Sequence, residues 1–359
     1  MNSYLKNIKS SIRELTPYTL VQHEFKVKIN QNESPFDLPD WLKQEILAEC
    51  LQLSWNRYPS FNPNRLLERL AALLKISSEQ LLVGNGSNEL LQLLMTAVLN
   101  EQKKLLLVQP TFLIYQKVCS LTGAEPIRLE FAADWSFPVE AILEVIEKNK
   151  VALCIFCSPN NPTGSTLKAK DLRKILERTS GLVLVDEAYH EFSNERYLNL
   201  LPLYQNLILT RTFSKALGLA GLRVGYLIAH PAIITELRKA KLPYNLNAFS
   251  EIVAAKSLQH FDLIEINIQK IKTEKRRLVQ ALSDIPENTV YPSQANFFML
   301  ETPVAAKALF DYLIKRGVWV RDISQHHPRL QNVLRITVGK KSENDRLFEL
   351  IENFIRSEI

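Results

Sequence analysis

The chain has 359 residues, of which 46% are hydrophobic, so it can bury more than one core. We therefore expect a large domain and a smaller one and exclude a disordered chain. Lys and Arg number 44 against 38 Asp and Glu, a formal net charge of +6, but the two signs are interspersed. The basic run at residues 275–277 is interpreted as a solvated helix face. Without a basic stripe or a reading motif, no nucleic-acid partner is expected.

No apolar stretch reaches the roughly 20 residues of a membrane span, and residues 1–15 lack the apolar block of a signal peptide. We expect a cytoplasmic protein with no membrane partner and no metal site. The cysteines are too few and too scattered for a disulfide framework; they are Cys50, Cys119, Cys154 and Cys157. The last two lie in an apolar run, which favours core packing over redox chemistry because a redox thiol must be exposed.

The middle of the chain contains short apolar runs separated by helical patterns. Because apolarity in these runs is continuous rather than alternating, we interpret them as strands buried on both faces, as in a parallel sheet covered by helices. They lie at residues 104–108, 152–157, 181–185, 206–209 and 224–228. The predicted fold class is α/β, with a mainly parallel central sheet and helices on both faces.

The C-terminal part has a different composition. A long amphipathic pattern extends from Phe249 to Leu282, and alternating strands with two helices follow it. The strand candidates are residues 297–300, 318–321 and 333–338. We predict a large domain at residues 46–284, including the long connecting helix, and a small α+β domain formed by residues 1–45 and 285–359.

Six of the ten glycines fall in three short segments: GNGSNE at residues 84–89, NNPTG at 160–164 and RTFSKALGLAGLRVGY at 211–226. The first follows a strand-like run and opens a helical pattern, so its N–H groups and the Ser87 hydroxyl can face an anion. An ordinary turn with Ser87 or Asn88 as the helix N-cap fits this segment equally well. The glycine spacing matches neither a dinucleotide fingerprint nor a P-loop.

Two charged residues follow buried strands. Asp186 ends the run LVLVD, at the sheet edge where α/β proteins bind ligands; a helix cap or a surface salt bridge is the alternative. Lys215 follows the next run, and its neighbours supply hydroxyl donors and a guanidinium suited to a phosphate. These neighbours are Thr212, Ser214 and Arg223.

A nucleophilic lysine, a phosphate cradle and a carboxylate together predict the cofactor pyridoxal phosphate. The lysine would form an imine with the aldehyde, and the carboxylate would keep the pyridine nitrogen protonated. Asn161 and Tyr189 could donate hydrogen bonds to the ring oxygen and lower the pKa of the imine.

These residues resemble the fold-type I pyridoxal phosphate aminotransferases, and most closely the histidinol-phosphate aminotransferases, over nearly the whole chain. No single matching segment is specific, but ten in this order are. The segments are LTPY at 15–18, INQNESP at 29–35, RYP at 57–59, GNGSNE, QPTF at 109–112, NNPTG, DEAY at 186–189, RTFSKALGLAGLRVGY, LPYN at 242–245 and LRITVG at 334–339.

The resemblance implies that Lys215 is the cofactor lysine and the proton shuttle at the substrate α-carbon. It implies that Asp186 pairs with the pyridine nitrogen and that Asn161 and Tyr189 contact the ring oxygen. The implied phosphate ligands are Ser87, Asn88, Thr212, Ser214 and Arg223. Phe112 stands where most relatives have a tyrosine, and a phenyl ring can still stack on the pyridine.

Tyr58 resembles a tyrosine that relatives offer to the phosphate across a dimer interface, which implies a homodimer with shared active sites. Ser34 and Asp37 depart from the family pattern, in which an asparagine and a glycine are common. These departures concern substrate specificity more than chemistry.

For the substrate, Arg335 interrupts a strand pattern, and such an arginine either extends to the surface or meets a buried anion. By position it resembles the carboxylate-binding arginine of these transaminases. The other implied substrate contacts are Tyr18, Asn161, Tyr244 and Arg321. Arg321 could equally be a surface residue.

The resemblance implies a transaminase of small molecules, which interconverts L-histidinol phosphate and 2-oxoglutarate with imidazole acetol phosphate and L-glutamate. Decarboxylation of a phosphorylated amino acid such as threonine phosphate, or transamination of aromatic amino acids, are alternatives on the same fold. A non-catalytic regulator would need a separate DNA-binding domain, for which the segment before the family motifs is too short.

Overall fold

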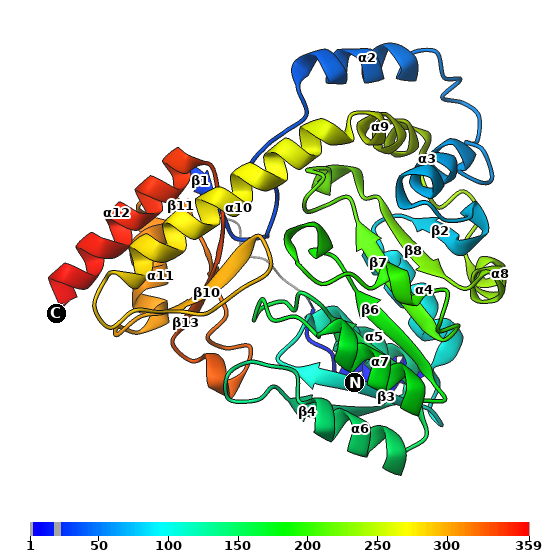
Figure 1. Cartoon of the computed structure of the whole chain (residues 1–359), viewed down its shortest axis with the longest axis horizontal. Helices are drawn as coiled ribbons and strands as arrows, with labels where there is room; N and C mark the ends of the chain where they lie inside the picture. Colours follow the sequence, from blue (N-terminus) through cyan, green and yellow to red (C-terminus); the bar gives the residue numbers. More distant parts are fainter. Residues whose placement is uncertain (1–2, 18–22, 359) are drawn as a thin grey trace.

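The computed structural model describes residues 3–17 and 23–358, and its main feature is a seven-stranded sheet covered by helices (Figure 1). The strand order is β2-β8-β7-β6-β5-β3-β4. The bounds are β2 Leu81–Gly84, β3 Lys104–Gln109, β4 Glu125–Glu130, β5 Val151–Cys157, β6 Leu182–Asp186, β7 Leu207–Thr212 and β8 Gly225–Ala229. Strands β3 to β7 pair in parallel, and β8 runs antiparallel to β7 and β2. The predicted mainly parallel sheet is confirmed.

Helices cover both faces of this sheet because its strand side chains alternate between two apolar clusters. Leu105 and Leu107 of β3 face one cluster, and Leu106 and Val108 face the other. The first cluster contains residues of α4 (Ser87–Val98), α5 (Leu113–Thr122) and α8 (Pro231–Ala240). The second contains residues of α6 (Val139–Lys148) and α7 (Ala169–Arg178).

The C-terminal residues form a four-stranded antiparallel sheet in the order β12-β13-β10-β9. Its strands are β9 Thr289–Val290, β10 Phe297–Glu301, β12 Arg321–Asp322 and β13 Val333–Thr337. Helices α11 (Ala306–Lys315) and α12 (Lys341–Glu358) pack on each other here. A parallel pair joins β1 (Val27–Lys28) to β11 (Val318–Trp319), so this N-terminal segment lies with the C-terminal residues. We keep the division at residues 45/46 and 284/285 as a proposal.

The remaining elements connect these parts. They are α1 Ser10–Arg13, α2 Asp40–Cys50, α3 Asn64–Leu74, α9 Ala248–Gln259 and α10 Phe261–Ser283. The short 3₁₀ helices are η1 Ser3–Asn7, η2 Ser78–Gln80, η3 His190–Phe192, η4 Leu198–Leu200, η5 Ala220–Leu222 and η6 Pro328–Leu330. Helix α10 runs along the molecule and contacts α12 and β9 (Figure 1).

Two element predictions were wrong in detail. The pattern from Phe249 to Leu282 is not one helix, because the backbone leaves the helical region at His260 (φ −113°, ψ 42°) and separates α9 from α10. There the His260 ring packs edge-on against Trp41 of α2, a tertiary contact that a local pattern does not show. The candidate strand 318–321 is divided between two sheets at Val320, since β11 pairs with β1 and β12 with β13.

The cysteine interpretation is confirmed. All four cysteines are free and buried. Cys154 and Cys157 lie in β5, and burial raises the pKa of Cys154 to about 12, which makes its thiol unreactive at neutral pH.

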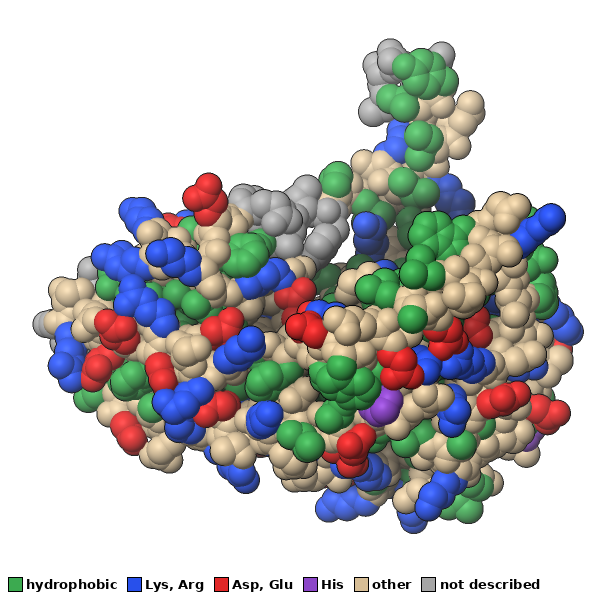
Figure 2. All heavy atoms as spheres, turned by 90° about the horizontal axis from the view of Figure 1, so that it is seen from above, with side chains coloured by type: hydrophobic (Ala, Val, Ile, Leu, Met, Phe, Trp, Pro, Cys, Tyr) green, Lys and Arg blue, Asp and Glu red, His purple; other side chains and the backbone are tan. Residues whose placement is uncertain are grey.

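Charge is interspersed on the face seen in Figure 2, where Lys and Arg side chains lie among Asp and Glu side chains. In the described part of the chain, no helix is long and apolar enough to cross a membrane. Nor do the residues at 3–17 and 23–358 include a His, Cys, Asp and Glu group suited to a metal ion.

The basic run at residues 275–277 is not a simple solvated face. Lys275 turns inward, and its Nζ donates hydrogen bonds to the carbonyl oxygens of Ser293 (2.8 Å) and Ala295 (2.7 Å). Burial lowers the pKa of this amine to about 8. The prediction failed because these carbonyls come from a loop that follows the helix and cannot be seen in the local pattern.

We expect Lys275→Ala to lower the free energy of unfolding by about 1–3 kcal/mol, because two carbonyls lose a buried donor. Arg276→Ala is the matched control: Arg276 is exposed and, among the residues that the structure describes, hydrogen-bonds only to Thr273, so a change within about 0.5 kcal/mol is expected. Urea unfolding of both variants measures the difference. Equal changes in the free energy of unfolding in the two variants would show that the hydrogen bonds of Lys275 do not stabilise the protein.

Candidate active site

A cavity of about 630 Å³ opens at the carboxyl edge of the parallel strands. Asp186 and Thr212 line it at the ends of β6 and β7, as expected for a ligand site in an α/β sheet. The predicted site residues that line it are Ser87, Asn88, Phe112, Asn161, Asp186, Tyr189, Thr212, Ser214, Lys215, Arg223, Arg321 and Arg335. Positions far apart in the chain are thus brought into one site.

Lys215 lies in the turn after β7, at the centre of this cavity. Its Nζ donates a hydrogen bond to the carbonyl oxygen of Gln31 at 2.7 Å. Burial, with the nearby guanidinium of Arg335, lowers the pKa of Lys215 to about 7. The lowered pKa increases the share of the amine that is uncharged at neutral pH, and this is the form that can attack a carbonyl carbon.

Asp186 is 3% exposed, which excludes a surface salt bridge, and the next helix, η3, has Tyr189 as its N-cap, so Asp186 is not a helix cap either. Its Oδ2 accepts a hydrogen bond from the Tyr115 hydroxyl (2.6 Å), and its Oδ1 accepts one from the Ala188 N–H (3.1 Å). Burial raises the pKa of Asp186 to about 6, although these donors oppose the rise. A cationic ligand atom beside the carboxylate would stabilise its charged form.

Hydrogen-bond donors gather where α4 begins. Ser87 is the first residue of this helix, and the N-cap is Gly86 (φ 80°) without a side-chain cap, so neither Ser87 nor Asn88 caps it. The positive φ of Gly86 favours glycine, and a Cβ there would also lie 2.6 Å from Nη2 of Arg223, so this guanidinium lies directly beside the start of the helix. The helix N-terminus thus presents free N–H groups beside a guanidinium, a favourable environment for a phosphate.

The hydroxyls of the 211–226 segment extend the same donor set. Thr212 Oγ1 donates to Ser214 Oγ at 3.0 Å, and Arg223 Nη1 donates to the same Ser214 oxygen at 3.1 Å. A Cβ on Gly225 would collide with the backbone N of Ser87, so the two segments touch.

The opposite end of the cavity carries arginine and amide groups. Arg335 is 8% exposed, so it does not extend to the surface. It donates to Asn161 Oδ1 (2.5 Å) and to the Asn30 carbonyl oxygen (2.7 Å). Tyr189 accepts a hydrogen bond from Asn32 Nδ2 at 3.0 Å, and burial raises the pKa of its hydroxyl.

The residues present fit pyridoxal phosphate. The cavity lining combines donors suited to a phosphate, a buried carboxylate suited to a cationic ring nitrogen, and an amine with lowered pKa. Asn30, which lines the cavity and is 0% exposed, has a side-chain amide with no hydrogen-bond partner among the described residues. An unpaired buried amide indicates that a polar ligand completes this environment.

Sequence reasoning missed several residues of this site. Tyr115 contacts Asp186 from inside α5, where its spacing looks like that of any apolar core residue. Asn30 and Asn32 belong to the INQNESP segment, which was recognised without roles for its members. His326 and Lys117 also line the cavity, and no local signal marked them.

Three predicted residues are not brought to the cavity. Tyr18 lies outside the described residues. Tyr58 and Tyr244 do not line the cavity; their rings stack on each other with centroids 4.6 Å apart, and they are 81% and 42% exposed. Within one chain, neither can contact a ligand in this cavity.

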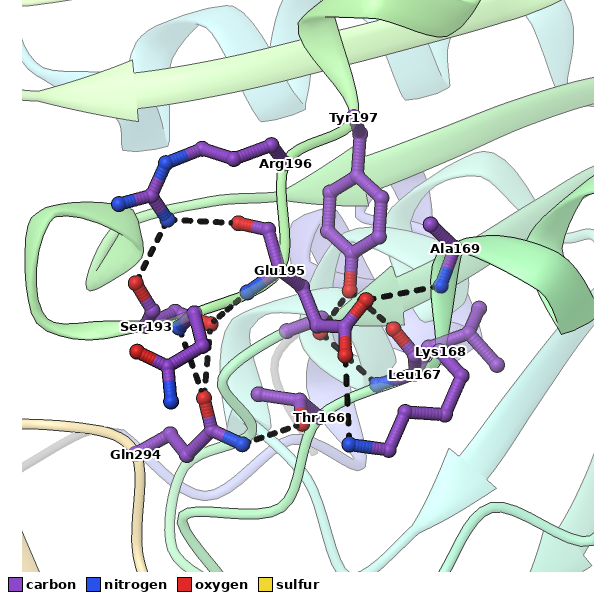
Figure 3. A network of polar contacts seen from close by, with 11 residues as sticks. Thr166, Leu167, Lys168, Ala169, Ser193, Glu195, Arg196, Tyr197 and Gln294 are labelled. Carbon is purple, nitrogen blue, oxygen red and sulfur yellow. Dashed lines mark hydrogen bonds and ion pairs between the residues drawn. The ribbon is translucent and has the colours of Figure 1, made fainter.

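The 158–169 loop, which contains Asn161, is held by a polar network at its 166–169 end (Figure 3). Gln294 accepts from the Asn194 N–H at 2.8 Å and donates to Thr166 Oγ1 at 3.2 Å. Its own N–H donates to the Gly164 carbonyl oxygen at 2.9 Å. The segment before β10 therefore holds the loop that presents Asn161 to Arg335.

Comparison with known proteins shows to which family the chain belongs. The family model described as aminotransferase class I and II matches residues 24–351. The chain belongs to this aminotransferase family. Two curated relatives of this aminotransferase are histidinol-phosphate aminotransferases. That of Chlorobaculum tepidum is 39% identical, over 92% of this chain and 94% of the relative. That of Pyrococcus furiosus is 37% identical, over 97% and 98%.

Solved structures share the fold of this aminotransferase. A histidinol-phosphate aminotransferase from Sinorhizobium meliloti, in complex with pyridoxal-5'-phosphate, has a TM-score of 0.88 at 23% identity and covers 98% of both chains. An L-threonine-O-3-phosphate decarboxylase from Porphyromonas gingivalis has a TM-score of 0.79 at 22% identity, covering 92% of this chain and 99% of its own. At these identities the likeness concerns the fold alone.

Proposed function

We propose that this aminotransferase uses pyridoxal phosphate to interconvert L-histidinol phosphate and 2-oxoglutarate with imidazole acetol phosphate and L-glutamate. The observation that carries the proposal is the pair Arg321 and Arg335. These residues are directly opposite each other in the β12–β13 ladder, and both line the cavity. Like charges placed opposite on a sheet repel, and a substrate phosphate between them would offset that repulsion. The long match to histidinol-phosphate aminotransferases supports the same substrate.

We assign different steps of the reaction to different residues of the chain. When bound, pyridoxal phosphate supplies an electron sink that makes the α-hydrogen of the substrate acidic. We assign the cofactor phosphate to the N–H groups of Ser87 and Asn88 and to the side chains of Thr212, Ser214 and Arg223. Asp186 would stabilise a protonated pyridine nitrogen by ion pairing, and Phe112 would stack on the ring.

At the substrate end, Arg335 and Arg321 orient the anionic group, a carboxylate in glutamate and a phosphate ester in histidinol phosphate. Lys215 Nζ, uncharged in part at neutral pH, accepts the proton from the substrate α-carbon. Asn161 and Tyr189 would hold the ring oxygen by hydrogen bonds.

We also propose a homodimer. Exposed apolar side chains gather around α2 and the segment after it; they include Trp41, Leu47, Leu51, Trp55, Tyr58 and Phe61. Such residues are unusual on the surface of a monomer. A partner that covers them would place Tyr58 and Tyr244 near its own site, which would explain their distance from the cavity here. The cytoplasmic location stays a prediction.

A substrate panel tests the function. With 2-oxoglutarate as acceptor, we expect the kcat/KM of histidinol phosphate to exceed those of phenylalanine and tyrosine by at least about tenfold. Threonine phosphate should release no carbon dioxide. A higher kcat/KM for an aromatic amino acid, or carbon dioxide release without consumption of a keto acid, would contradict the proposal in favour of the corresponding alternative.

A further inference from the structure

His326 lies at the mouth of the cavity, in the segment between β12 and β13. It lines the cavity together with Arg321 and Arg335. It also lines a smaller adjoining cavity of about 150 Å³, beside Phe112 and Leu113. Its side chain is therefore placed between the arginine pair and the region assigned to the cofactor ring.

The backbone around His326 is firmly anchored. Arg329 donates to the carbonyl oxygens of residues 131–133 at 2.7, 2.9 and 3.1 Å, and its guanidinium lies 3.9 Å from the Trp135 ring centroid. The residue after His326, His327, places its Nε2 2.9 Å from Glu130 Oε2. These contacts fix the position from which the His326 side chain reaches the cavity.

The two adjacent histidines differ in their partners. His327 also accepts a hydrogen bond from the Arg329 N–H at 3.3 Å. For the His326 ring, the described residues provide no hydrogen bond and no ion pair. A side chain with hydrogen-bonding capacity, fixed at a cavity mouth without a protein partner, is available to a ligand.

The surroundings also set the charge of this ring. Burial, followed by the charges of Arg321 and Arg335, lowers the pKa of His326, and Asp322 opposes the effect. The lowered pKa favours the uncharged ring, which has one N–H donor. Such a donor can bind an anion already neutralised by the two arginines.

The two amino donors place their anions differently. In glutamate a carboxylate is attached directly to the α-carbon. In histidinol phosphate a methylene and an ester oxygen separate the phosphorus from that carbon, so the phosphate extends farther and carries more oxygen acceptors. A donor beyond the arginine pair can therefore reach the phosphate without reaching the carboxylate.

We propose that His326 is a specificity-determining residue that donates a hydrogen bond to the phosphate ester of the substrate and makes no contact with the α-carboxylate of glutamate. This inference rests on the proposed function. His326 thus adds an uncharged hydrogen-bond donor to the two arginines. This donor distinguishes phosphorylated from carboxylated substrates.

The experiment compares the holoenzyme with His326→Ala, His326→Gln and the matched control His327→Gln. We expect His326→Ala to raise the KM of histidinol phosphate about tenfold, the size expected for one hydrogen bond to a charged group. The KM of glutamate and both kcat values should stay within about twofold. His326→Gln, which keeps an N–H donor, should restore most of the loss. His327→Gln, whose amide can still donate to Glu130 and accept from the Arg329 N–H, should leave both KM values within about twofold.

The outcomes separate the two proposals. If wild type turns over histidinol phosphate and His326→Ala leaves its KM unchanged, only the role of His326 is overturned. Equal increases in the KM of both substrates would overturn it too, because they indicate a general disturbance of the site. If wild type does not accept histidinol phosphate, the proposed function fails, and the role of His326 fails with it.

Discussion

Replacement of Lys215 by alanine is expected to abolish transamination, with kcat falling at least about a thousandfold. Two properties of the residue would be lost together: a nucleophilic amine and an acceptor for the proton on the substrate α-carbon. The lowered pKa of about 7 makes both tasks possible near neutral pH. Stopped-flow and steady-state assays with glutamate measure the loss.

Lys215→Arg is the matched control for this prediction. It keeps a positive charge that can still bond to the Gln31 carbonyl oxygen, but a guanidinium stays charged in proteins and cannot act as a nucleophile. We expect it to be as inactive as the alanine variant. Activity within tenfold of wild type in either variant would show that another residue does the chemistry.

Asp186→Asn is expected to lower kcat/KM by about a hundredfold or more, since a neutral amide cannot stabilise a cationic ring nitrogen. Tyr115→Phe is the milder comparison because it keeps the carboxylate and removes only the 2.6 Å hydrogen bond to it. We expect a loss below about tenfold for Tyr115→Phe. Comparable losses in both variants would contradict a specific need for the negative charge.

Asp186→Asn, which is expected to lower activity, should raise the stability of the cofactor-free protein relative to wild type as pH rises. The pKa of Asp186 rises from 3.8 to about 6 on folding. Between these values the folded state binds more protons than the unfolded state, so the free energy of unfolding falls as pH rises through this window. Asp186→Asn removes this dependence.

We therefore expect the stability of Asp186→Asn relative to wild type to increase by about 1–2 kcal/mol between pH 5 and pH 8. Urea unfolding of the cofactor-free proteins at the two pH values measures it. A difference between variant and wild type that does not change with pH would show that the carboxylate titrates normally in the folded state.

Much of the site was predictable because its residues follow recognisable local patterns. Asp186 and Lys215 come directly after continuous apolar runs, and parallel strands end at the same edge, so their proximity follows from the fold class. The glycine segments marked the proposed phosphate donors because the backbone requires glycine there: Gly86 has a φ of 80°, and Gly225 packs against the backbone N of Ser87.

Other features depend on contacts between distant segments and leave no local signal. Tyr115 reaches Asp186 from another element, and Lys275 turns inward to carbonyls of a later loop. The division at Val320 depends on which strands are available as partners. His326 was missed because its importance comes from its position next to Arg335, which tertiary structure alone provides.

The most direct test of the account is to locate the covalent attachment of the cofactor. The holoenzyme is reduced with borohydride, digested and analysed by peptide mass spectrometry. The account predicts one modified peptide, from the segment at residues 211–226, with the pyridoxyl group on Lys215. A modification on any other lysine, or none on Lys215, would contradict the assignment of this cavity as the active site.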